Sequence, residues 1–202
     1  MPSLLATAFQ NTLLKAGANL TAQLASRWRT PPGSIPTPLD LQRIFEFAIF
    51  GFIGANVGYA WHHFLEHSFP TWTVTFIAKH SDDDPESLLK YEAPPVPATQ
   101  NGELKVSWRN IWAKVVVDQT VGLPVMIAIF LVITNVARLA TFAMVLDVVK
   151  EKEWGLIKAG WTIWPAVCVV NFYWVPVKSR VIVASCVGFG WNIFLSLVSM
   201  AR

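Results

Sequence analysis

Residues 161–196 read WTIWPAVCVVNFYWVPVKSRVIVASCVGFGWNIFLS, and this stretch decides the fold class. It is rich in Trp, Pro and Phe, and its only charged residues are Lys178 and Arg180. Proline, asparagine and arginine are tolerated beside such apolar runs in lipid-embedded helices, because neighbouring helices and the membrane interface satisfy their polar groups. The stretch therefore predicts two membrane-embedded helices.

The composition of the whole chain agrees with a membrane protein. Hydrophobic residues make up 53% of the 202 residues, charged residues make up 14%, and the mean hydropathy is +0.43. Soluble domains usually contain about 25% charged residues. The ten Trp residues suit membrane–water interfaces. We predict one all-α integral membrane helical bundle over residues 1–202, with four nominal spans and up to six apolar helical segments.

The charge pattern bears on partners. The net charge is only +3, and the basic residues form no cluster interleaved with aromatic residues. Nucleic acid is therefore not expected as a partner, whereas membrane lipids are. The two cysteines, Cys168 and Cys186, lie in apolar runs and are expected to be small buried hydrophobic residues rather than a disulfide or metal ligands.

Residues 1–29 allow two interpretations. The first 39 residues contain no Asp or Glu and carry Lys15, Arg27 and Arg29, which is the composition of a mitochondrial targeting sequence. The same region also fits a first membrane-embedded helix from Leu4 to Leu24 with a face of small residues. The two interpretations are compatible if the segment is not removed.

The middle of the chain is expected to alternate between helices and breaks. Residues 41–67 predict a second helix on which small residues are spaced by three and four, so another helix can approach closely. These small residues are Gly51, Gly54, Ala55 and Gly58. Further along we expect a polar loop at 79–110, a break near Thr134–Arg138 and a solvated connection at 150–153.

The C-terminal region, residues 154–202, is expected to fold as an unequal helix pair. Pro165 and Pro176 each remove a backbone donor, so Trp161–Val177 should be distorted or tilted rather than a straight span. Val181–Met200 should return beside it as a regular helix. Asn171 should face protein, because an unpaired amide in hydrocarbon costs several kcal/mol.

Several motifs of this chain match one family. The C-terminal pattern W-x-x-W-P, N-F, V-P, R and W-x-x-[YF]-L-S is present, as are K-x-x-x-D-Q followed by Pro and D-x-x-R before the second helix. The matching residues are Trp161, Trp164, Pro165, Asn171, Phe172, Val175, Pro176, Arg180, Trp191, Leu195, Ser196, Lys114, Asp118, Gln119, Pro124, Asp40 and Arg43. The chain resembles a divergent member of the Mpv-seventeen and 22-kilodalton peroxisomal membrane protein family.

The sequence also departs from the family pattern. Cys168 stands where the family has Gln, and the polar loop is longer than usual. The family's G-P-x-x-H-x-W-Y appears here as Ala55, Asn56, Tyr59, Trp61 and His62. Any role attached to the replaced residues is not carried over to this chain.

Five residues are candidates for a pore or for helix packing: Lys114, Asp118, Gln119, Asn171 and Arg180. An ionisable side chain inside an apolar span indicates a functional site, although a helix-end ion pair is the simpler interpretation. Lys114 and Asp118 are four residues apart and are expected to pair on one helix face. Asn171 is expected either to fix helix packing or to line a polar path, and Arg180 to reach lipid headgroups or a carboxylate.

A zinc-protease arrangement, H-x-x-E-H, occurs at residues 63–67. It lies at the membrane-exit end of the second helix, and no third protein ligand is apparent, whereas a catalytic zinc needs three. We interpret it as an interfacial polar cluster. No nucleotide or nucleophile motif is found, so we expect no enzyme activity, no catalytic residue, no cofactor and no metal.

The resemblance implies a channel-type protein that affects solute permeability and mitochondrial homeostasis. The alternative is a structural or accessory subunit of a larger inner-membrane complex, because Gly, Ala and Trp faces are dense and no rich polar stripe is evident. Flux through reconstituted protein would favour the first hypothesis, and co-migration with a large complex in mild detergent the second. The partners we expect are a homo-oligomer or a larger inner-membrane complex, and migration only as a free monomer or small homo-oligomer would count against the accessory subunit. We expect the mitochondrial inner membrane, with the peroxisomal membrane as the alternative.

Overall fold

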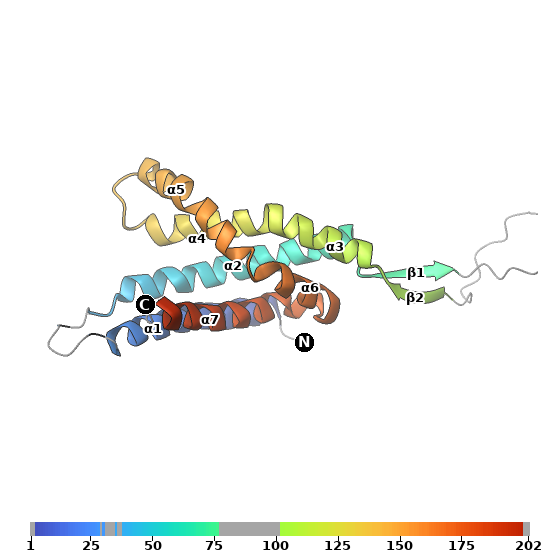
Figure 1. Ribbon diagram of the computed structural model, residues 1–202, viewed down its shortest axis with the longest axis horizontal. Coiled ribbons are helices and arrows are strands. Elements are labelled where there is room, and N and C mark those ends of the chain that lie inside the picture. Colours follow the sequence, from blue (N-terminus) through green and yellow to red (C-terminus); the bar gives the residue numbers. More distant parts are fainter. Residues whose placement is uncertain (1–2, 29, 31–34, 36–37, 77–101, 200–202) are drawn as a thin grey trace, which may run out of the picture.

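The computed structural model describes residues 3–28, 30, 35, 38–76 and 102–199, and it is a helical bundle with one small hairpin (Figure 1). The predicted all-α membrane bundle is confirmed, and the hairpin is the exception to it. The elements are α1 Leu4–Trp28, α2 Leu41–Ser68, β1 Trp72–Phe76, β2 Gly102–Val106, α3 Trp108–Val117, a π-helical turn Asp118–Gly122, α4 Leu123–Asn135, α5 Phe142–Gly160, α6 Trp164–Trp174, a 3₁₀ turn Val177–Ser179 and α7 Arg180–Ser199.

Within the described residues, two helical segments are long and apolar enough to cross a membrane. They are α2 and the continuous run from α3 through α4, Trp108–Asn135. A third span is possible if α5 and α6, which are bent by 62° at their junction, count as one broken span. Figure 1 shows α2 and the α3–α4 run side by side in opposite directions, so a single bundle carries the spans.

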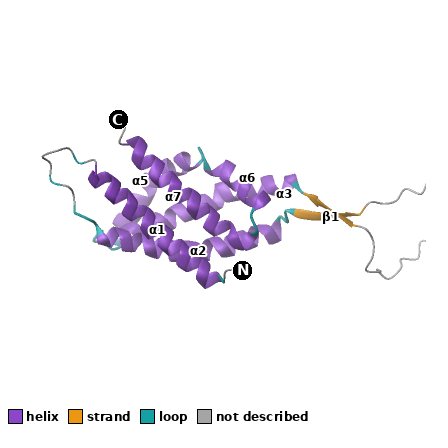
Figure 2. Ribbon diagram, turned by 90° about the horizontal axis from the view of Figure 1, so that it is seen from below, coloured by secondary structure: helices purple, strands orange, loops and turns teal. Residues whose placement is uncertain are grey.

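The small-residue stripe of α2 brings α1 into close contact, as predicted. A Cβ atom built on Gly51 would lie 2.8 Å from the Cα of Thr12 and 2.9 Å from the carbonyl oxygen of Asn11. Backbone atoms cannot move aside cheaply, so only glycine fits here. Asn11 then donates from Nδ2 to the Gly51 carbonyl and accepts from Ser185 Oγ on α7. Figure 2 shows the resulting layer of α1, α2 and α7.

A two-stranded antiparallel hairpin replaces part of the predicted polar loop. Its register pairs Trp72 with Val106 and Phe76 with Gly102, and it projects beyond the end of α2 and α3 (Figure 1). The prediction for residues 102–110 is therefore wrong, because these residues form β2 and the start of α3. Residues 79–101 lie outside the described residues.

The breaks of the second half are partly as predicted. α4 ends at Asn135, within the expected break at Thr134–Arg138. Residues 150–153 do not form a connection, because their side chains lie on the surface of the continuous helix α5. A run of charged residues occurs both on the exposed face of a helix and in a solvated loop, so the sequence alone did not distinguish the two.

The C-terminal pair has the predicted form. Pro165 lies in the first turn of α6, where its missing N–H removes no helical hydrogen bond. α6 ends at Trp174, just before Pro176, and α7 returns as a regular helix that packs against α6. Trp161 to Val177 is thus a short, bent segment rather than a straight span.

Candidate functional site

The candidate site begins at the π-helical turn between α3 and α4. Pro124 has no N–H, and its ring clashes with the carbonyl group four residues earlier, that of Thr120. A wider turn over Asp118–Gly122 accommodates this proline without breaking the long helical run. Turns of this kind are rare and occur frequently at functional sites, and here the turn carries Asp118 and Gln119.

Asp118 is the centre of a group that we call the mid-span cluster: Trp61, Asp118, Gln119 and Cys168. Asp118 Oδ1 accepts a hydrogen bond from Trp61 Nε1 at 2.8 Å. Its Oδ2 atom accepts from Gln119 Nε2 and from Cys168 Sγ, both at 3.1 Å. Both carboxylate oxygens are therefore held by neutral donors. The cluster connects α2, the π-helical turn and α6.

Gly122 makes room for this arrangement. A Cβ atom on Gly122 would lie 2.6 Å from Trp61 Nε1 and 2.9 Å from Asp118 Oδ1. A methyl group at this position would therefore separate the indole from the carboxylate that it contacts.

We expect Gly122→Ala to lower the free energy of unfolding by about 1–3 kcal/mol, as overpacking does elsewhere. Gly155→Ala is the matched control, because a Cβ there meets nothing within 4 Å on the exposed face of α5. Unfolding of both variants in mixed detergent micelles measures the difference. Equal stabilities would contradict the close approach of Trp61 to Asp118.

A second group, the hairpin-end cluster, lies at the end of the bundle from which the hairpin projects: Glu66, Thr71, Lys114 and Arg180. Glu66 Oε2 lies 2.7 Å from Lys114 Nζ and 2.8 Å from Arg180 NH1. The other carboxylate oxygen accepts the backbone N–H of Thr71 at 2.8 Å. Lys114 is 0% exposed and Arg180 is 3% exposed. The Glu66 carboxylate is thus the shared ion-pair partner of two buried cations.

Arg180 also donates hydrogen bonds to backbone carbonyl groups at the C-terminal end of α6. Because Pro176 has no N–H, the carbonyl of Phe172, four residues earlier, loses its helical partner. Arg180 NH2 donates to that carbonyl at 3.3 Å, and its Nε donates to the Val175 carbonyl at 3.0 Å. Asn171 Nδ2 donates to the Arg180 carbonyl at 3.2 Å. Asn171 therefore faces protein, as predicted, and Arg180 reaches a carboxylate rather than headgroups.

The predicted pairing of Lys114 with Asp118 is wrong. Lys114 Nζ binds Glu66 and Thr71 across the helix interface and lies 5.3 Å from the centroid of the Phe172 ring. A buried ammonium group requires a full opposite charge and further hydrogen-bond acceptors, and Glu66 with Thr71 supplies both. The Asp118 oxygens are already occupied by the indole, amide and thiol donors of the mid-span cluster.

Three buried polar atoms near the two clusters have neither a hydrogen-bond partner nor an ion-pair partner within the described residues. They are His62 Nδ1, Gln119 Oε1 and Asn171 Oδ1. The His62 ring lies 5.8 Å from the Phe172 ring, and Gln119 and Asn171 are 7% and 3% exposed. Burying such an atom unpaired costs about 1–3 kcal/mol, so each would be stabilised by a water molecule or another small polar molecule.

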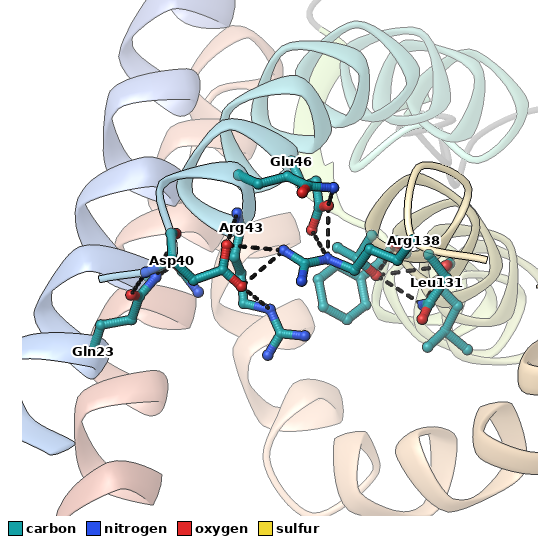
Figure 3. Close-up of polar contacts among 11 residues, drawn as sticks. Gln23, Asp40, Arg43, Glu46, Leu131 and Arg138 are labelled. Carbon is teal, nitrogen blue, oxygen red and sulfur yellow. Dashed lines mark hydrogen bonds and ion pairs between the residues drawn. The ribbon is translucent and has the colours of Figure 1, made fainter. Parts of the chain in front are cut away.

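A third group, the loop-end network, lies at the end of the bundle opposite the hairpin, where α2 begins and α4 ends (Figure 1), and Figure 3 shows its contacts. Arg138, just after α4, donates from Nε to both oxygens of Glu46 at 2.8 and 2.9 Å, and from NH2 to both oxygens of Asp40 at 3.1 and 2.9 Å. Asp40 caps α2 by accepting from the Arg43 N–H, and its backbone N–H donates to Gln23 Oε1 on α1. This network connects α1, α2 and α4.

The structure brings the five predicted site residues together in two of these groups. Lys114 and Arg180 belong to the hairpin-end cluster, with Asn171 bonded to it, and Asp118 and Gln119 belong to the mid-span cluster. The sequence did not predict that Glu66 is the central acceptor of the hairpin-end cluster, because Glu66 was considered only as part of H-x-x-E-H. It also missed Gly122, because nothing in a sequence shows what a glycine approaches.

The cysteines and histidines show further differences. Cys168 is buried as predicted, but its thiol donates to Asp118, whereas Cys186 is exposed. His63 and His67 are exposed, while Glu66 joins the hairpin-end cluster. Among the described residues, no three His, Cys, Asp or Glu side chains are placed to hold a metal ion.

Comparison with known proteins connects this architecture to one family. Residues 135–196, which include α5, α6 and most of α7, match the model of the Mpv17 / PMP22 family. This match agrees with the resemblance that the sequence motifs indicated, over the C-terminal third of the chain. No solved structure matches it.

Three relatives illustrate the similarity. Protein SYM1 of Gibberella zeae is 36% identical over 92 residues, covering 45% of this chain and 50% of the relative. The mitochondrial inner membrane protein Mpv17 of Caenorhabditis briggsae is 33% identical over 43% of this chain and 48% of the relative. PXMP2/4 family protein 3 of Dictyostelium discoideum is 24% identical over 81% of this chain and 71% of the relative.

The matched stretch spans about half the length of the first two relatives, at 50% and 48%. The predicted location in the mitochondrial inner membrane agrees with the name of the Caenorhabditis briggsae relative, which places that protein in this membrane.

Proposed function

We propose that this protein is a channel of the mitochondrial inner membrane that affects solute permeability and, through it, mitochondrial homeostasis. The observation that carries the proposal is the set of buried polar side chains along the α3–α4 span. The mid-span and hairpin-end clusters lie about one helical turn apart on this span, because Asp118 follows Lys114 by four residues. Polar and charged groups at such depth are expensive and usually mark a path for ions or solutes.

The unpartnered atoms support the same proposal. Gln119 Oε1 and Asn171 Oδ1 can each accept a hydrogen bond that no described residue supplies. In the proposed mechanism these atoms contact water or solute when the path is hydrated. The ion pairs of Glu66 with Lys114 and Arg180 hold the hairpin end closed, and opening requires α2 to separate from α3 and α7 at this point.

Asp118→Asn tests the path directly. The substitution keeps the shape of the side chain but removes its negative charge, so we expect the reconstituted variant to show an altered unitary conductance and a lower preference for cations over anions in planar bilayers. Asp147→Asn is the matched control. It is the same substitution on α5, where the side chain is 76% exposed and, among the described residues, pairs only with Lys150.

Unchanged conductance and selectivity in Asp118→Asn would contradict the assignment of the path. Folded wild-type protein that forms no pore and migrates with a large complex in mild detergent would contradict the channel itself. That second result would favour the accessory-subunit hypothesis.

A further inference from the structure

A pocket of about 240 Å³ opens at the loop end of the bundle, beside the loop-end network. It is lined by Asn19, Ala22, Gln23, Ser26, Arg27, Pro38 and Arg43. Five of these residues lie on one face of α1, and Arg43 lies in the first turn of α2. Neither the mid-span cluster nor the hairpin-end cluster contributes to this lining.

The pocket offers donors and few acceptors. Gln23 Oε1 is occupied by the Asp40 N–H, and the Asp40 carboxylate beside the pocket is occupied by Arg138 and by the Arg43 N–H. In contrast, no hydrogen bond within the described residues uses Asn19 Nδ2, although Asn19 is only 8% exposed.

The two arginines of the pocket, Arg27 and Arg43, can also donate hydrogen bonds to a ligand. Arg27 makes no ion pair with a described acidic residue, and Arg43 Nε reaches Asp40 only at 4.0 Å. The N-terminus of α2 favours an anion in the pocket, whereas the carbonyl groups at the C-terminus of α1 disfavour one. Because these two effects oppose each other, the two arginines determine that the electrostatic potential in the pocket is positive. The chemistry that fits this set of donors is an anionic oxygen group such as a phosphate.

The position of the pocket indicates where that phosphate comes from. The pocket lies where the α2 span begins, and large apolar side chains are exposed around it: Leu20, Leu24, Trp28, Leu41 and Phe45. Trp favours the membrane–water boundary, and the leucines and Phe45 suit contact with acyl chains. Basic pockets at the ends of membrane helices bind lipid headgroups.

We propose that this pocket binds the phosphate headgroup of an anionic phospholipid, with Arg27 and Arg43 as the charged ligands and Asn19 and Ser26 as neutral donors. The lipid joins α1 to α2 at the membrane surface. This proposal does not depend on the channel proposal, because no residue of the proposed path is involved.

The test uses delipidated full-length protein in a neutral detergent, titrated with phosphatidylglycerol or with phosphatidylcholine and followed by native mass spectrometry. Wild-type protein should bind phosphatidylglycerol more tightly than phosphatidylcholine. Arg27→Gln and Arg43→Gln should each weaken phosphatidylglycerol binding by roughly fivefold, and both together by about thirtyfold, from about 1 kcal/mol for each basic residue near the surface. Arg109→Gln, on the exposed surface of α3 and outside the pocket, is the matched control.

Two further measurements complete the test. Ser26→Leu keeps both arginines but fills part of the pocket, so it should weaken phosphatidylglycerol binding even if the double arginine variant does not fold. Excess inorganic phosphate should displace the lipid only weakly, because it lacks acyl chains. Wild-type affinity in all pocket variants, equal binding of the two lipids, or displacement by free phosphate as effective as by lipid would each overturn the proposal.

Discussion

Glu66→Gln is expected to lower the free energy of unfolding by about 3–5 kcal/mol, which is the usual cost of removing one partner of a buried ion pair. The carboxylate is the shared partner of Lys114 and Arg180, which are 0% and 3% exposed. Without it, two like charges remain close together beside the Phe172 ring. The size of the effect comes from these stranded cations rather than from one lost hydrogen bond.

A second substitution separates this explanation from a general loss of packing. Lys114→Met in the Glu66→Gln background removes one of the two stranded cations and keeps the apolar part of the lysine side chain, so it should restore part of the lost stability. Glu151→Gln, at an exposed position of α5, is the matched control and should have little effect. Unfolding by sodium dodecyl sulfate in mixed micelles measures all four proteins. A double variant less stable than Glu66→Gln would contradict the shared-carboxylate explanation.

The fold was largely predictable because it depends on local patterns. Apolar runs interrupted by proline predict helices and their ends from residues that are neighbours in sequence, and this was sufficient for α1, α2, the break after α4 and the α6–α7 pair. The hairpin was missed because its strands, Trp72–Phe76 and Gly102–Val106, are separated by a long polar segment. Pairing between strands so far apart leaves no periodic signal in either strand.

The site was predictable as a list of residues but not as a set of contacts. An ionisable residue in an apolar run is evident from sequence, so Lys114, Asp118 and Arg180 could be named. Their partners depend on how α2, α3 and α7 cross, and Glu66 lies 48 residues from Lys114 in the chain. The i,i+4 rule describes an isolated helix, where no tertiary partner competes. Inside the bundle, Lys114 pairs with Glu66, because the Asp118 oxygens already accept from Trp61, Gln119 and Cys168.

Arg138→Gln is expected to lower the free energy of unfolding clearly, since it leaves a buried carboxylate without its cation. Glu46 is 3% exposed, and its remaining described partner is the neutral amide of Gln42. Arg138 itself is 26% exposed, so solvent reduces the effect below that of Glu66→Gln. Adding Glu46→Gln to the variant should recover stability by neutralising the stranded charge. No recovery in the double variant would show that Glu46 is not the origin of the loss.

The pH dependence of the same variant distinguishes the two carboxylates that Arg138 contacts. The backbone N–H of Arg43, and after it the Arg138 guanidinium, holds the pKa of Asp40 below its usual range. A lowered pKa means that the contribution of Asp40 is fully present above the ordinary pKa of the carboxyl group and is lost as the pH falls through the lowered value. Since the larger cause is the helix cap and not the guanidinium, Arg138→Gln should retain this acid transition, shifted only slightly upward. Asp40→Asn should abolish it, because the amide caps the helix without titrating. An acid transition that disappears in Arg138→Gln but persists in Asp40→Asn would show that the titrating group is not Asp40. The stability of the loop-end network would then come from the pair of Glu46 and Arg138 alone.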